Sequence, residues 1–298
     1  MASYFDEIAR NRRKTILLFI LFALFFFAVT FAAVWLLGGG LLGLVVGFVI
    51  VLVLSLIYYA YAEKLVLAVS KAQPADKAKY QQLYDIEGGL SSAAQVPMPR
   101  MYVINDPNPN AFAAGKRKNP SISVTTGLLN TMDREELEGV LAHETSHIAD
   151  NDIQYMMVAL VFAGVIGIVA AFIRNIVWFG GFRRIGGQGA AIAIVVAIVF
   201  SLVAWLFAML IRMAISRSRE SLADANGARM TRNPASLVSA LQKIQKYDAN
   251  PRATSVQHAT EVTASLYFSN PFTSKSLLNI FSTHPPIEER IKKLQQMY

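Results

Sequence analysis

The chain has 298 residues, of which 54% are hydrophobic and only 16% are charged, whereas roughly 25% of the residues in an average soluble domain are charged. This composition excludes a soluble enzyme, a disordered chain and a purely peripheral protein, and it predicts a membrane protein. The formal net charge is +8, yet the Lys and Arg residues gather beside apolar segments and no nucleic-acid-binding motif is present, so we expect no nucleic acid partner. With no cysteine in the chain, any metal has to be bound by His, Asp or Glu.

The first apolar segment runs from Thr15 to Ala62 without a charged residue. As one helix it would rise about 72 Å, more than two crossings of a hydrocarbon core of roughly 30 Å. Because three glycines at 38–40 divide it, we expect residues 1–62 to form a membrane hairpin with spans at about 15–37 and 41–62. A signal peptide is the competing interpretation, but its apolar region has only about 7–15 residues.

A second membrane hairpin is predicted at residues 153–211, where two further charge-free segments cover 153–173 and 185–211. Basic residues before the first span and after the second and fourth place both termini in the cytoplasm by the positive-inside rule. Three arginines in the loop of the second hairpin argue mildly against this, so that hairpin either inserts partly or exposes them outside; they are Arg174, Arg183 and Arg184.

The remaining segments, 63–152 and 212–298, are long enough to build one domain between them. Residues 75–90 have a polar helical pattern, and residues 101–104 and 121–126 are predicted to be strands. Asp133 and Glu136 form a capping box that opens a helix. The fold class expected is an α-helical membrane protein with about four transmembrane helices and a mainly α, α+β domain.

Within that helix the chain reads His143-Glu144-Thr145-Ser146-His147. Two histidines at positions i and i+4 project from one face of a helix and can share a Zn²⁺ ion, and the intervening glutamate can act on a water molecule at the metal. The alternative is a helix with two solvated surface histidines.

A hydrolytic zinc site needs a third protein ligand and one open position. A metzincin would have glycine at 150 and histidine at 153, where this chain has Asp150 and Ile153. A carboxylate is therefore the better candidate, and Glu220 is the best one, because the hairpin at 153–211 would return it to the depth of His147. Asp224, one turn later, can accept the free ring N–H of a ligating histidine. Alternatively, both carboxylates balance nearby arginines on a solvated face.

Taken together, these features resemble the HtpX-type membrane zinc metalloproteases, which are related to the CAAX-processing zinc proteases. The resemblance covers nearly the whole chain. It is carried by the basic amino terminus with its paired spans and by four further stretches, Asn110–Gly115, His143–His147, Arg219-Glu220 with Ala223-Asp224, and Ser282–Arg290.

The resemblance implies a gluzincin fold in which Glu220 is the third zinc ligand and Asp224 orients a histidine. It also implies that a substrate-binding strand follows the cleft, with Asn110, Ala111, Phe112 and Ala113 along it. His284 either stabilises the oxyanion of the reaction or merely packs at the start of a helix. Three positions depart from the family pattern: Thr145, Asp150 and Ser221.

The function expected is that of a zinc metalloendopeptidase with one Zn²⁺ per subunit, in which Glu144 is the general base and His284 a further catalytic candidate. Its expected partners are membrane protein or peptide substrates and the lipid bilayer. The resemblance points to the quality control of misfolded or damaged membrane proteins under stress, in a bacterial-type inner membrane with a cytoplasmic active site. Two alternatives remain: a site-2-type intramembrane protease and a catalytically silent membrane scaffold.

Overall fold

The computed structural model describes residues 40–158, 160, 217–250, 254–260, 263–271 and 285–297, together with positions 13, 16, 17, 20, 24 and 27. The described residues fall into two compact units. The first is built from residues 63–157 and the described residues after position 216, and it contains the predicted protease segments. The second contains residues 40–62.

Helix α2 (Gly40–Val69) covers the second predicted membrane span. Many of its large apolar side chains are exposed, among them Leu41 and Leu42. In the part of the chain that the structure describes, no helix is long and apolar enough to cross a membrane. The other three predicted spans lie mostly outside the described residues, so the four transmembrane helices and the division into two membrane hairpins stay predictions.

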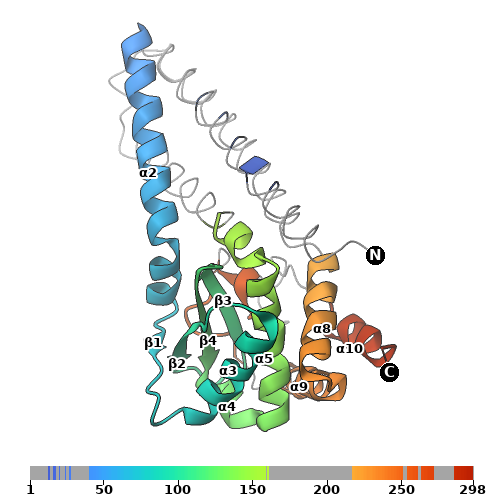
Figure 1. The fold of residues 1–298 in the computed structure, drawn as a ribbon. Coiled ribbons are helices and arrows are strands. Elements are labelled where there is room, and N and C mark those ends of the chain that lie inside the picture. The colour runs from blue at the N-terminus through green and yellow to red at the C-terminus, as the bar shows by residue number, and fades with distance from the viewer. Residues whose placement is uncertain are drawn as a thin grey trace. The chain divides into compact units, whose positions relative to one another are not determined.

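The sheet of the first unit has four strands in the order β1-β2-β4-β3. They are β1 (Gln73–Pro74), β2 (Arg100–Ile104), β3 (Ala111–Lys116) and β4 (Asn119–Thr125). The two strands predicted from the sequence are β2 and β4, which pair in parallel with Met101 opposite Ile122. β3 and β4 form an antiparallel hairpin, and β3 lies at the edge of the sheet (Figure 1).

The helices of this unit pack around α5 (Arg134–Ala149), which contacts the edge strand β3 as well as three other helices. Its start is the predicted capping box, in which the Asp133 carboxylate accepts the Glu136 backbone N–H and the Glu136 side chain accepts the Asp133 backbone N–H. Its apolar residues at helical spacing are all buried; they are Leu137, Val140, Leu141 and Ile148.

The other helices are α3 (Gln81–Ala94), α4 (Thr126–Thr131), α8 (Arg217–Thr231), α9 (Pro234–Asp248), the 3₁₀ turn η2 (Ala264–Leu266) and α10 (Ile287–Gln295). The helix predicted at 75–90 begins only at Gln81. The reason is that Asp76 accepts hydrogen bonds from the backbone of Ala78 and Lys79 and holds this stretch in turns. The first unit is therefore a mixed α/β domain, in agreement with the α+β domain expected of segments 63–152 and 212–298.

Glycine at position 227 brings α8 close to α5. A β-carbon there would lie 3.0 Å from the backbone nitrogen of His143, inside ordinary van der Waals contact. The absence of a side chain at this position thus lets the two helices that carry the candidate metal ligands approach each other.

Candidate metal centre

Helix α5 places both histidines of the predicted motif inside the domain. The side chains of His143 and His147 are 1% and 8% exposed, and their Nε2 atoms lie 3.2 Å apart. This burial excludes the alternative of two solvated surface histidines. Two imidazole nitrogens that converge in the interior form one half of a metal site.

Glu220, in the first turn of α8, supplies the third donor. Its carboxylate oxygens lie 3.8 Å from Nε2 of His143 and 3.5 Å from Nε2 of His147, and the three candidate ligand atoms all lie within 4.8 Å of one another. Ligand atoms around a tetrahedral zinc ion, each about 2.0–2.1 Å from the metal, are separated by roughly 3.3 Å. The distances and the donor types therefore fit a zinc ion, and the burial of Glu220 argues against a merely solvated carboxylate.

Glu144 is buried beside these ligands, on the same helix. The backbone N–H of Ala113, in the edge strand β3, donates a hydrogen bond to its carboxylate. Burial raises the pKa of Glu144 to about 7, and the charge of Glu220 acts in the same direction. A carboxyl group with a pKa near neutrality can both accept and release a proton at physiological pH.

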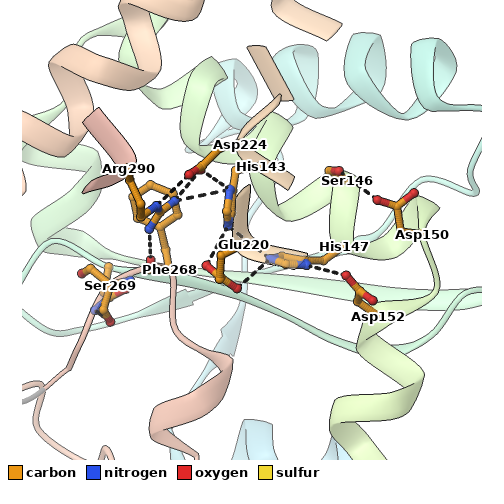
Figure 2. A network of polar contacts seen from close by, with 11 residues as sticks. His143, Ser146, His147, Asp150, Asp152, Glu220, Asp224, Phe268, Ser269 and Arg290 are labelled. Atoms are coloured by element: carbon orange, nitrogen blue, oxygen red, sulfur yellow. Dashed lines mark hydrogen bonds and ion pairs between the residues drawn. The ribbon is translucent and has the colours of Figure 1, made fainter. Parts of the chain in front are cut away.

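His143 is held from its other ring nitrogen by Asp224 of α8 (Figure 2). The Nδ1 atom of His143 lies 2.9 Å from Oδ1 of Asp224. The same carboxylate accepts two hydrogen bonds from the guanidinium of Arg290, at 2.7 and 2.9 Å. Burial opposes ionisation of Asp224, but the charge of Arg290 and the hydrogen bonds from His143 and Arg290 together outweigh it and lower the pKa of Asp224 to about 2. Burial also lowers the pKa of His143 to about 4, so its ring is neutral at physiological pH, as a ligand must be.

His147 is held in a similar way by Asp152, whose Oδ2 lies 3.2 Å from Nδ1 of the ring. Burial disfavours the charged ring, but the hydrogen bond to Asp152 and the negative charge of Glu220 prevail and raise the pKa of His147 to about 9. The acidic groups around this ring therefore favour positive charge at its position, which suits a bound cation.

Asp152 and Arg290 are site residues for which the sequence analysis gave no role. The sequence does contain a signal that Arg290 is buried and paired. Arg290 shares one face of α10 with apolar residues at helical spacing, namely Ile287, Ile291 and Leu294. A charged side chain on such a face is rarely buried unless it has a partner. The sequence signal for Asp152 is weaker: it is the last acidic residue before the apolar segment 153–173.

Of the four residues predicted to line a substrate cleft, Asn110 directly precedes β3 and the other three lie in it. Their contacts differ. Ala113 reaches Glu144 through its backbone. The carbonyl of Ala111 accepts a hydrogen bond from the backbone of Phe268, and the Phe112 ring packs edge-on against Tyr267. The Asn110 side chain bonds to the backbone of Ser269. The segment 267–269 thus covers the first part of this strand, and the substrate role of the four residues stays a prediction.

His284 lies outside the described residues, and its two alternative roles stay open. His258, the remaining histidine of the chain, is exposed and lies outside the cluster of candidate metal ligands. Thr145, one of the departures from the family pattern, donates a hydrogen bond to Glu87, a fully buried carboxyl of α3. Burial raises the pKa of Glu87 to about 8.

The comparisons with known proteins agree with this geometry. The family model described as Peptidase family M48 matches residues 77–298. A protein named "Protease HtpX homolog" from Caldanaerobacter subterraneus subsp. tengcongensis is 43% identical, over 97% of this chain and 96% of its own length. Proteins of the same name from Syntrophobacter fumaroxidans and Lactobacillus helveticus are 41% and 39% identical, covering 91% and 98% of this chain and 96% and 99% of their own lengths.

Proposed function

The chain belongs to peptidase family M48 and is a metalloprotease of the HtpX type, and from this premise we propose that it is a zinc-dependent endopeptidase of membrane protein quality control. In this proposal His143, His147 and Glu220 hold one Zn²⁺ per subunit and Glu144 is the general base. One observation carries it: three buried donors of the right chemistry converge beside a buried glutamate.

Glu144 performs the proton transfers of peptide hydrolysis in this scheme. A Zn²⁺ ion at this position supplies a Lewis acid that polarises a carbonyl group and lowers the pKa of water. The Glu144 carboxylate takes the proton from the attacking water and later delivers it to the leaving amine. Its contact with the backbone N–H of Ala113 supports this role, because that hydrogen bond fixes the carboxylate while leaving it free to accept a proton.

The substrate backbone is proposed to follow the stretch 110–113 and to pair with the edge strand β3 at its end near Ala113, because the segment 267–269 already bonds to the strand at 110–112. Extended peptides bind exposed strand edges through main-chain hydrogen bonds. The position of Ala113 supports this proposal, since its backbone already reaches Glu144, so a peptide that pairs beside it would present its carbonyl groups to the candidate base.

Membrane proteins, misfolded or damaged, are the proposed substrates, and a bacterial-type inner membrane the proposed location, with a multi-pass chain and a cytoplasmic active site. The charge-free segments, the exposed apolar side chains of α2 and the flanking Lys and Arg residues support this. A site-2-type intramembrane protease would place the histidines in an apolar span, whereas α5 begins with the exposed charged residues Arg134 and Glu135. A silent scaffold would have no reason to keep a buried base beside three donors.

The test is metal removal and restoration on the full chain in detergent, with an unfolded membrane protein as substrate. Cleavage should stop when a chelator removes the metal and return when Zn²⁺ is added, with one zinc bound per chain. Cleavage that continues at full rate in metal-free protein would refute zinc dependence. A chain that binds zinc but cleaves no unfolded membrane protein would refute the endopeptidase proposal.

A further inference from the structure

The polar residues around the site form two similar sets, one on each histidine (Figure 2). On one side Asp224 holds Nδ1 of His143 and is itself held by Arg290. On the other side Asp152 lies against Nδ1 of His147, and Nη1 of Arg219 is 3.6 Å from Oδ1 of Asp152. The second set lies on the side of the site away from Arg290.

We propose that Asp152 is a positioning residue that orients the His147 ring for metal binding, and that Arg219 acts through Asp152. This inference rests on the proposed zinc site and adds residues that the ligand motif does not include.

Hydrogen bonding decides the orientation of the ring. An ionised carboxylate can only accept, so the His147 nitrogen that faces Asp152 has to carry the hydrogen. In the neutral ring Nε2 then keeps its lone pair, and Nε2 is the atom that points to Glu220 and to Nε2 of His143. Because His147 and Asp152 are both buried, little water competes for this hydrogen bond.

The backbone turn after α5 brings Asp152 to this place. The helix ends at Ala149, and Asn151 adopts a left-handed conformation with φ of 62°, which asparagine tolerates better than most residues. The chain therefore changes direction before Asp152, and the carboxylate returns to the ring of His147 instead of continuing around the helix.

Arg219 connects this aspartate to the third candidate ligand. It directly precedes Glu220 in α8, and its guanidinium stacks on the ring of Tyr155 with 4.6 Å between its central carbon and the ring centroid. Packing on an aromatic face restricts the guanidinium and keeps its charge near Asp152. His147, Asp152, Arg219 and Glu220 thus form one connected set.

The chain offers a matched control two residues earlier. Asp150 is as buried as Asp152, each 2% exposed, but its recorded partners are Asn226 at 3.1 Å and Ser146 at 3.5 Å, and neither is a candidate ligand. An aspartate-to-asparagine change removes the same charge at both positions and keeps the side-chain volume.

The experiment compares Asp152→Asn with Asp150→Asn in the full chain. The zinc dissociation constant is measured by competition with a chelator, and the visible absorption of the Co²⁺-substituted protein reports the ligand arrangement. Loss of a carboxylate partner to a ligating histidine costs roughly 10- to 100-fold in metal affinity. We expect Asp152→Asn to weaken zinc binding by this factor and to alter the Co²⁺ spectrum, and Asp150→Asn to do neither.

Arg219→Gln gives an independent measurement, including in the case that Asp152→Asn does not fold. It should weaken zinc binding, and the metal-free protein should also unfold at a lower temperature, because buried Asp152 loses its charged partner. Equal zinc affinity and spectra in Asp152→Asn and Asp150→Asn, with normal zinc binding by the wild type, would overturn this inference alone. Unchanged zinc affinity in Arg219→Gln would overturn the role of Arg219. A wild-type chain that binds no zinc would overturn the proposed function itself.

Discussion

Replacing Arg290 with methionine should destabilise the protease domain severely, because it leaves a buried carboxylate without its cation. Arg290 is 1% exposed and donates hydrogen bonds to both oxygens of Asp224 and to the carbonyl of Phe268. Methionine fills a similar volume but donates nothing, so the Asp224 charge would remain in the interior, at 2% exposure, with His143 as its remaining recorded partner.

The expected size follows from this burial. Removing one partner of a buried ion pair costs about 3–5 kcal/mol, whereas a folded domain is stable by about 5–15 kcal/mol in total. For a domain of this size each kcal/mol shifts the unfolding temperature by about 2–4 °C, so the transition should fall by roughly 6–20 °C. Adding Asp224→Asn to the variant should restore part of this loss, because the unpaired charge then disappears.

Thermal unfolding of the metal-free chain, followed by circular dichroism in detergent, measures this effect. Arg229→Met is the matched control, since Arg229 is an exposed arginine of α8 and surface substitutions usually change stability by less than about 0.5 kcal/mol. Equal transitions for Arg290→Met and Arg229→Met would refute the reasoning, as would a double variant that is less stable than Arg290→Met alone.

Three further predictions concern other parts of the same domain. Glu220→Gln should lose most of its bound zinc, as measured by elemental analysis; full occupancy would direct the search to another carboxylate. Gly227→Ala should push α8 away from His143 and weaken zinc binding in a chelator competition, because the new β-carbon meets backbone atoms; wild-type affinity would show that the helices can separate without harm. The raised pKa of Glu87, about 8 in the folded chain against 4.5, means that the unfolded state loses its proton first, so stability should fall between pH 5 and pH 8 by roughly 3 kcal/mol relative to Glu87→Gln. Parallel pH profiles of urea unfolding for wild type and Glu87→Gln would contradict this.

The local parts of the site were predictable from the sequence for a physical reason. The i, i+4 spacing of His143 and His147 determines that they share one helix face, and the capping box at Asp133 determines where that helix begins. The prediction of Glu220 as a ligand needed one further assumption. It assumed that the hairpin predicted at 153–211 returns the chain to the membrane depth of His147. The strands β2 and β4 were also predictable, because a short run of strand-forming residues beside turn residues is a local pattern.

The residues that hold the ligands were not predictable in this way. Asp152 reaches His147 only because Asn151 turns the backbone through a left-handed conformation, and helical periodicity says nothing about a chain that has left the helix. Arg290 lies 66 residues from Asp224 and 147 residues from His143 along the chain, so their contact depends on how α10 packs against α8. No local pattern encodes that packing, although an arginine on an apolar helix face indicates that some buried partner exists.

The central claim is that Glu144 is the base of a zinc peptidase and not one of the metal ligands. Its most direct test measures cleavage of an unfolded membrane protein and bound zinc in the same preparations of wild type and Glu144→Gln. The substitution keeps the shape of the side chain and removes its ability to take a proton, so the variant should bind one zinc per chain and cleave nothing. Cleavage at the wild-type rate in Glu144→Gln would contradict the mechanism, and loss of zinc from the variant would contradict the assignment of its ligands.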